Sequence, residues 1–278
     1  MEPATQQPGF LGAGRVPCLP GWSGGGRRQQ RGRPKARSLA AWRRALQILS
    51  GAVCVAVAGP RLAAAAPEAS EAELRAGRLA APIVVDGQLE AAWSDAAGFA
   101  VAHEFAPLDS RAAPVATEGY VGLTDDALLV AFVCHEPDAA ALRATLTERD
   151  RMYADDFVGV VLDTYQDHRQ AYEFFSNPHG VQGDAMWHAD RAQDDDEDVL
   201  WQANGGDDLS FDAVWEAAGR VEADRWVVEM RIPLSALRFP DQARQRWSVH
   251  LVRVYPRQYR YQLSWRPISR DSNSFMAQ

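Results

Sequence analysis

Short segments in which apolar and polar residues alternate with a period of two constrain this chain more than any other feature. In the clearest one, Arg225 to Pro233, apolar residues such as Trp226 fall on one face, and Val227, Glu229 and Arg231 fall on the other. Successive side chains of a β-strand point to opposite faces, so this spacing predicts a strand with one buried face. Similar segments are Thr117 to Leu123, Leu128 to Cys134, Phe157 to Leu162, Gln170 to Ser176, Phe211 to Ala218, Arg246 to Val254 and Arg260 to Trp265.

Turn-forming residues separate these segments. Asp125-Asp126 and residues 166–168 lie between neighbouring segments and predict hairpin turns, and Asn177-Pro178-His179-Gly180 is a strong turn signal. Helical pattern is confined to single turns at Leu89 to Trp93, Ala139 to Leu146 and Leu234 to Leu237. The pattern predicts an all-β fold, an antiparallel β-sandwich of the jelly-roll or immunoglobulin-like type. We expect about eight or more strands and one or two short helices.

The first 66 residues differ from the rest. Residues 1–37 are rich in Gly, Pro, Gln and Arg and have no apolar periodicity, so we predict a disordered basic head. Arg43 and Arg44 precede an apolar stretch, and small residues follow it, which predicts a signal peptide over residues 38–66. A buried helix of the mature fold is the alternative for this stretch. We expect export, with a periplasmic or outer-membrane location, a linker over 67–81, the sandwich domain over 82–270 and a junction over 271–278.

Charge is distributed unevenly along the chain. Residues 1–66 hold 10 of the 29 Lys and Arg residues and one acid, so residues 67–278 carry 19 bases against 36 acids, a net charge of −17. A phosphate backbone repels such a body, which argues against nucleic-acid binding. Cys134 is the one cysteine after residue 66, so no disulfide can form within the body. We expect Cys134 to be a small buried residue.

Five phrases occur in order along the body. They are Ile83 to Trp93 (IVVDGQLEAAW), Ala154 to Thr164 (ADDFVGVVLDT), Ala171 to Asp184 (AYEFFSNPHGVQGD), Phe211 to Trp215 (FDAVW) and Trp226 to Phe239 (WVVEMRIPLSALRF). Together they resemble the family 9-like carbohydrate-binding domain. The resemblance covers about residues 82 to 270 and is closest to the version at the head of bacterial outer-membrane β-barrel proteins. It implies a β-sandwich, secretion, binding of an oligo- or polysaccharide, calcium in some relatives, and a C-terminal outer-membrane β-barrel in a longer form of the chain.

Sugar rings stack on exposed aromatic faces, while planar polar side chains bind the hydroxyls, so a sugar site needs tryptophans outside the core. Trp93, Trp226 and Trp247 lie in apolar alternation or in the entry turn, and we expect them in the core. Trp187 and Trp201 flank a polar segment and are the candidate sugar platform, with a lid over the sandwich edge as the alternative. Trp215 is intermediate. The polar candidates are Asn177, Gln182, Asp184 and Arg149, the last from a loop, residues 148–151, that could equally form a surface ion-pair set.

Acidic residues supply a candidate calcium site. Seven carboxylates occur in the 15 residues from Asp184 to Asp198, and calcium takes six to eight oxygen ligands. The regular spacing of an EF-hand loop is absent, so a solvated acidic loop is the alternative. Asp155 and Asp156 open a predicted strand and are candidate calcium ligands, with turn capping and sugar contact left open for both.

The body contains no Gly-rich phosphate loop, nucleophile elbow or H-E-x-x-H motif. Glycoside hydrolysis needs two facing carboxylates, and no phrase singles out a pair among the 36 acids. The leading hypothesis is therefore a secreted, non-catalytic carbohydrate-binding domain that supports polysaccharide uptake or breakdown. The alternatives are a periplasmic interaction domain of an outer-membrane β-barrel protein without an active sugar site and, less favoured, a glycoside hydrolase.

Overall fold

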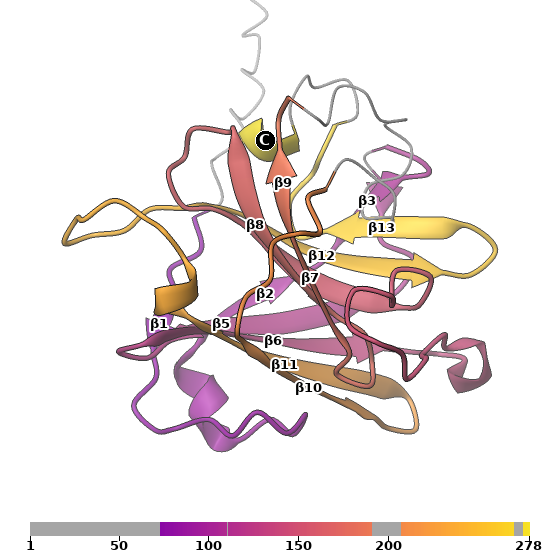
Figure 1. Cartoon of the computed structure of the whole chain (residues 1–278). Helices are drawn as coiled ribbons and strands as arrows, with labels where there is room; N and C mark the ends of the chain where they lie inside the picture. The colour runs from indigo at the N-terminus through magenta and orange to yellow at the C-terminus, as the bar shows by residue number, and fades with distance from the viewer. Residues whose placement is uncertain (1–72, 110, 191–206, 270–274) are drawn as a thin grey trace, which may run out of the picture. The chain divides into compact units, whose positions relative to one another are not determined.

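The computed structural model describes residues 73–109, 111–190, 207–269 and 275–278. The expected basic head, the signal peptide, Trp201 and most of the acidic segment lie outside these residues. Two β-sheets pack against each other over the described part of the chain (Figure 1), and nearly all neighbouring strands are antiparallel. The all-β sandwich predicted from the alternating segments is confirmed.

The first sheet has the strand order β1-β5-β6-β11-β10, and β2 pairs with the same edge of β5 as β1 does. Only the short β1 runs parallel to its neighbour among the described pairings of this sheet. Its strands are β1 (Gly77–Arg78), β2 (Ala97–Ala100), β5 (Thr117–Leu123), β6 (Ala127–His135), β10 (Glu216–Val221) and β11 (Arg225–Pro233).

The second sheet has the order β4-β3-β13-β12-β7-β8-β9. Neighbours along the chain pair as hairpins from β7 to β9 and from β12 to β13, while β12 and β7 meet by a crossover. Its strands are β3 (His103–Ala106), β4 (Arg111–Ala112), β7 (Phe157–Asp163), β8 (Gln170–Ser176), β9 (Gln182–His188), β12 (Ser248–Pro256) and β13 (Arg260–Ser264).

Helical structure in the described residues consists of short 3₁₀ turns. They are η1 (Ala91–Asp95), η2 (Ala139–Ala141), η3 (Leu234–Ala236) and η4 (Phe275–Ala277). The first three overlap the three single turns predicted from the sequence, although η1 begins and ends two residues later and η2 is shorter than predicted. Within the described residues, no helix has the length and apolar character needed to cross a membrane.

Apolar side chains form three layers rather than one. The main core lies between the sheets and includes Phe132, Trp226 and Leu251. A second cluster, with Phe157 and Trp187, covers the opposite face of the second sheet. A third and smaller cluster covers the outer face of the first sheet. Strands buried on both faces read as continuous apolar segments, which explains the composition of β6 (ALLVAFVCH).

The double burial changes the interpretation of β11. Its predicted bounds are confirmed, but its second face is not exposed: Val227 is 4% exposed and Glu229 is fully buried. That face lies under the segment that contains η1. Cys134 is also fully buried, as expected, and burial raises the pKa of its thiol to about 12.

One predicted strand is displaced, and several strands are additional. The expected strand Phe211 to Ala218 begins only at Glu216, because the backbone of Ala213 bonds to side chains of Arg149 and Asp184 instead of to a neighbouring strand. Strands β2, β3, β4 and β9 had no counterpart among the predicted segments. The described part of the expected linker contributes β1 and the buried residue Leu79 to the first sheet.

Candidate functional site

The exposure of the indole rings separates the tryptophans of the described residues into two groups. Four of them, Trp93, Trp187, Trp215 and Trp226, are at most 5% exposed. The other two, Trp247 and Trp265, are half-buried. Both of these line the same groove, so the requirement for indoles outside the core points to this place in the described part of the fold.

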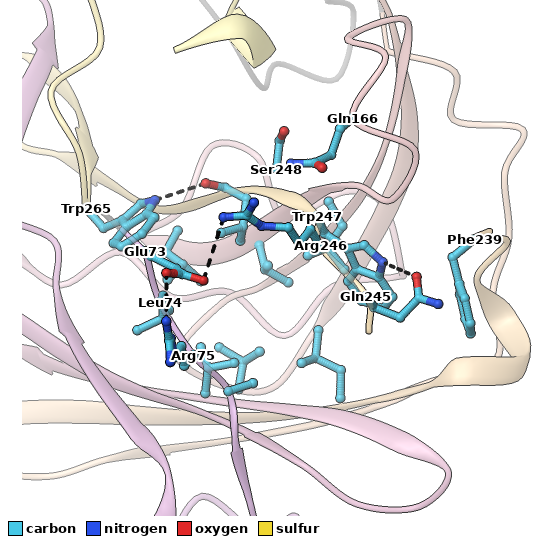
Figure 2. Close-up of a pocket in the computed structure, with 18 of the residues that line it drawn as sticks. Glu73, Leu74, Arg75, Gln166, Phe239, Gln245, Arg246, Trp247, Ser248 and Trp265 are labelled. Carbon is cyan, nitrogen blue, oxygen red and sulfur yellow. Dashed lines mark hydrogen bonds and ion pairs between the residues drawn. The ribbon is translucent and has the colours of Figure 1, made fainter. Parts of the chain in front are cut away.

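The groove has a volume of about 1020 Å³ and lies where β6 begins and β7 ends, at one end of the sandwich; Figure 2 shows side chains that line it. Its floor is apolar and belongs to both sheets, because inward-facing side chains of β5 and β6 meet those of β7 and β12 there. The floor residues are Val121, Leu128, Val130, Val160, Leu162 and Leu251. An apolar cleft with a polar rim is the usual form of a ligand site.

Strand geometry places the two indoles on the inner side of the second sheet. Trp247 directly precedes β12 and shares the inward phase of Val249 and Leu251, while Trp265 directly follows β13. The backbone N–H of Trp265 donates to the Leu251 carbonyl at 3.0 Å, and its indole Nε1 donates to the Val249 carbonyl at 3.0 Å. These bonds hold Trp265 in place at the groove, and Figure 2 shows both indoles among the lining side chains.

The loop between η3 and β12 supplies one wall of the groove. The ring of Phe239 packs against that of Trp247 with their centroids 5.5 Å apart. The Gln245 side-chain amide donates to the carbonyls of Pro240 and Gln242 at 2.7 and 2.8 Å, which folds the loop, and its Oε1 accepts from Trp247 Nε1 at 3.4 Å. The loop therefore fixes the indole of Trp247 from two sides.

Polar side chains form the rim. Arg246 lies 3.8 Å from the Glu73 carboxylate, which also binds Arg75 at 3.2 Å. Other polar side chains that line the groove are those of Gln166, His168, Arg244, Ser248 and Arg266. Amide, hydroxyl and guanidinium groups are the types that bind sugar hydroxyls, so the rim has suitable chemistry for a carbohydrate.

Three of the residues predicted from the sequence meet at another place, the edge strand β9. Arg149 Nε donates to Asp184 Oδ1 at 2.8 Å, and its Nη2 donates to the Ala213 carbonyl at 2.7 Å. The other oxygen of Asp184 accepts from the Ala213 N–H at 2.7 Å. Gln182 donates to the Trp215 carbonyl at 2.8 Å. These hydrogen bonds attach residues 211–215 to β9, so the three side chains have a structural role in the described contacts.

Asp150, beside Arg149, has a special conformation. Its φ of 63° lies in the left-handed region, which non-glycine residues adopt at an energetic cost. Its Oδ1 accepts from the Asp184 N–H at 3.0 Å, and its own N–H donates to the Gln182 carbonyl at 3.0 Å. Burial raises the pKa of the Asp150 carboxyl above its usual value, and the charge of Asp184 adds to the shift. The loop is therefore a well-anchored element beside β9.

Asn177 is fully buried and organises the turn that precedes β9. Its Oδ1 accepts from the N–H groups of His179 and Val181, and its amide donates to the Thr145 carbonyl and to Asp155 at 2.8 and 3.0 Å. Asp155 also accepts from the Thr145 N–H at 2.8 Å. The pair joins the turn to the loop before β7.

Asp156, the second candidate calcium ligand, accepts from the Arg143 N–H at 2.9 Å and from Arg257 Nη1 at 2.7 Å. Burial raises the pKa of its carboxyl, although the Arg257 guanidinium counteracts this shift. A calcium ion at Asp156 would share the carboxylate with Arg257, and the recorded partners of Asp155 are all hydrogen-bond donors. These contacts correspond to the capping role that the sequence left open, and calcium ligation by the two residues stays a prediction.

The six predicted sugar-binding residues thus occupy different surroundings. Trp187 packs in the outer apolar layer of the second sheet, and Trp201 lies outside the described residues. Arg149, Gln182 and Asp184 form the contacts at β9, with Asn177 close by in the chain. The groove lining recorded for the described residues contains none of the six. The polar segment Asp241 to Arg246 before Trp247 is comparable to the polar context of Trp187, but the alternating segment that Trp247 begins is typical of the core.

No family profile and no curated protein sequence matches the chain. Solved structures do match: the fold is similar to that of family 9 carbohydrate-binding modules. One such module, from Caldicellulosiruptor kristjanssonii in complex with glucose, is 14% identical with a TM-score of 0.48, and the match covers 69% of this chain and 85% of that chain.

A structure of a family 9 module from the same organism in complex with cellotriose is 14% identical, with a TM-score of 0.46 and coverage of 66% of this chain and 80% of that chain. A protein from Bacteroides uniformis is 16% identical, with a TM-score of 0.42 and coverage of 58% and 74%. At these identities the similarity concerns the fold. The proposals below therefore rest on the residues of this chain.

Proposed function

We propose that the protein is a non-catalytic carbohydrate-binding domain and that the groove beside Trp247 and Trp265 holds an oligo- or polysaccharide. The observation that carries the proposal is that the two half-buried tryptophans of the described residues line one groove, with amide and guanidinium groups on its rim. The ordered phrases in the sequence that resemble the family 9-like domain support the same ligand class.

The spacing of the two indoles suits an oligosaccharide better than a single ring. Trp265 lies opposite Leu251 in the β12–β13 register, and Trp247 precedes Leu251 by four residues. At about 3.3 Å per residue, the two backbone positions are roughly 13 Å apart along the strand direction. The Trp265 indole bonds to the Val249 carbonyl, two residues from Trp247, which places it roughly 7 Å from Trp247 in the same direction. Each indole would then contact a different sugar of the same chain, and the apolar floor between them would exclude water from the sugar C–H faces.

Binding without hydrolysis is proposed because of the number of acidic side chains in the groove. Hydrolysis of a glycosidic bond uses a general acid and a second carboxylate across the bond. Among the described residues that line the groove, Glu73 is the one acidic side chain, so the described lining supplies no second carboxylate to face it. The domain would serve polysaccharide uptake or breakdown that is carried out elsewhere.

The test is a titration of the full chain with xylo-, cello- and chito-oligosaccharides, followed by tryptophan fluorescence and calorimetry. Trp247→Ala and Trp265→Ala should each weaken binding by roughly tenfold, because each removes one stacking face. Tyr259→Ala is the matched control, since Tyr259 is 54% exposed and lies outside the groove lining. Absence of a response at millimolar ligand, or affinities unchanged in both tryptophan variants, would refute the proposal.

Trp187→Ala distinguishes the groove from the site predicted from the sequence. Trp187 is 5% exposed and packs in the outer apolar layer, so we expect this variant to lower the melting temperature while the folded fraction keeps its affinity. A folded Trp187→Ala protein with weakened binding would instead support the platform at β9.

We also propose export and calcium binding, both from sequence features. Cell fractionation with mass determination of the mature N-terminus tests the signal peptide over residues 38–66; an unprocessed cytosolic chain would contradict it.

Calcium should raise the melting temperature of the EDTA-treated chain if the acidic residues bind it, because a ligand of the native state stabilises that state. The genomic DNA beyond codon 278 shows directly whether an outer-membrane partner is encoded in the same frame.

A further inference from the structure

The groove carries a charge opposite to that of the body around it. Residues 67–278 have 19 bases and 36 acids. Among the described residues that line the groove, four are arginines and one, Glu73, is acidic. The arginines are Arg75, Arg244, Arg246 and Arg266. A local excess of positive charge in an acidic body focuses a potential that attracts anions to that cleft.

Glu73 neutralises only part of this charge. It is shared between Arg75 at 3.2 Å and Arg246 at 3.8 Å. Arg244 and Arg266 have no carboxylate within 4.0 Å in the described part of the chain. The Arg266 guanidinium lies over the Trp265 ring, 5.8 Å from its centroid, so one of these two guanidinium groups is next to a proposed stacking residue.

We infer that the groove binds an acidic oligosaccharide, one whose sugars carry carboxylate or sulfate groups, and that Arg244 and Arg266 bind those groups. The inference rests on the proposed function and names the ligand class for the same site. A guanidinium presents a planar set of N–H donors that matches a carboxylate or sulfate with two parallel hydrogen bonds, and it stays charged at every physiological pH. The indole stacks on the ring while the neighbouring guanidinium binds its acidic substituent.

The chemistry of the rim favours this ligand over a neutral glycan. A neutral sugar gains no ion-pair interaction from Arg244 or Arg266. Where it displaces water from the half-buried Arg266, it leaves that charge without a counterion, which costs binding free energy. An acidic sugar supplies the counterion at the same step. The negative body also disfavours anions elsewhere on the surface, so the groove would set the position and direction of the bound chain.

The experiment compares trigalacturonic acid with its methyl ester, which has the same rings and no carboxylate charge. Calorimetry on the full chain at about 20 mM and about 200 mM salt should show the acid binding roughly tenfold more tightly than the ester at low salt, with a smaller preference at high salt. A sulfated galactan trisaccharide and its desulfated form make the corresponding second pair. Tighter binding of the charged member in either pair supports the inference and identifies the group.

Arg244→Gln and Arg266→Gln should each reduce the preference for the charged member several-fold, and the double variant should remove it while the affinity for the uncharged member changes less than about twofold. Arg111→Gln is the matched control, because Arg111 is exposed on β4 and lies outside the groove lining. Its preference should equal that of the wild type.

Failure of this inference is distinct from failure of the proposed function. Tryptophan-dependent binding of neutral or esterified sugars with equal or higher affinity overturns the acidic ligand and leaves carbohydrate binding in place. A preference for the acid that survives in the double arginine variant also overturns it. The fatty acid dodecanoate tests whether the apolar floor of the groove holds an acyl chain instead. If dodecanoate binds and no sugar does, both the acidic-oligosaccharide ligand and carbohydrate binding are overturned.

Discussion

The buried carboxylate of Glu229 accepts a 2.8 Å hydrogen bond from the indole Nε1 of Trp93, a residue 136 positions earlier in the chain. The same carboxylate accepts from the backbone N–H groups of Asp86 and Gly87 at 3.1 and 2.8 Å. Glu229 lies in the middle of β11, on the face away from the main core. One acidic side chain therefore attaches the segment before η1 to the outer face of the first sheet.

Glu229→Gln should destabilise the domain. A carboxylate offers acceptors to all three N–H donors, whereas an amide keeps one oxygen and turns an NH₂ group toward the remaining donors. We expect a loss of roughly 1 to 3 kcal/mol in the free energy of unfolding, measured by urea denaturation of the full chain. Glu118→Gln, at an exposed position of β5, is the control and should be nearly neutral. Equal stability of the two variants would show that the three hydrogen bonds to Glu229 contribute nothing to the free energy of unfolding.

Cys134 should react with iodoacetamide only when the domain opens. The thiolate is the reactive form, and burial raises the pKa of the Cys134 thiol to about 12, so at pH 8 the native thiol is both protonated and inaccessible. In the unfolded chain its pKa returns to about 8.5, and labelling becomes fast. The labelling rate in a chain with Cys18 and Cys54 changed to serine should therefore rise with urea well before the unfolding midpoint. Rapid labelling at pH 8 without urea would contradict the burial.

The sequence predicts the strands well wherever one face alternates or both faces are apolar. The bounds Arg225–Pro233 coincide with β11, and the turn at Asn177 lies where β8 ends. Strand β9 (QGDAMWH) was missed because it mixes small, charged and aromatic residues, and its burial depends on partners distant in sequence. Phe211 to Trp215 has the alternation of a strand, yet Arg149, Gln182 and Asp184 bind its backbone.

The candidate site was harder to predict, because exposure in a β-sandwich depends on where the two sheets separate. Trp247 has an apolar, alternating context that is typical of the core. It lies directly before β12, at the end of the sandwich where the sheets leave a groove, so it is half-buried. Trp187 has a polar context but is covered by the outer apolar layer. The local composition of a strand indicates which of its faces is buried, but it does not indicate where along the sandwich a given residue lies.

Two glycines in strands should respond oppositely to alanine. A Cβ added to Gly159 in β7 would lie 2.0 Å from Cδ1 of Phe175, a ring that is fully buried, so Gly159→Ala forces a shift in the outer layer. We expect a loss of roughly 1 to 3 kcal/mol. The nearest atom to a Cβ on Gly98 in β2 is 4.0 Å away, so Gly98→Ala should be neutral or stabilising by up to about 1 kcal/mol. Thermal denaturation of both variants measures the contrast, and a stable Gly159→Ala protein would show that Phe175 can repack.

The end of the sandwich opposite the groove is closed by Arg253, a fully buried residue of β12. Its Nη1 donates to Thr117 Oγ1 at 2.9 Å and its Nη2 to the His135 carbonyl at 3.1 Å, so a side chain of the second sheet bonds to two strands of the first. The guanidinium also lies 5.4 Å from the centroid of the Trp226 ring and 3.7 Å from Glu136.

Arg253→Met should therefore be among the most damaging single changes in the domain. It leaves buried acceptors of the first sheet without a donor and removes one of the two cations beside Glu136, and losses of this kind cost roughly 3 to 5 kcal/mol. Arg225→Met is the control: Arg225 pairs with Glu222 at the surface, where an ion pair contributes less than about 1 kcal/mol. Urea denaturation compares the two. If Arg253→Met unfolds at the same urea concentration as Arg225→Met, the hydrogen bonds of Arg253 to the first sheet add no net stability beyond what a methionine packed against Trp226 supplies.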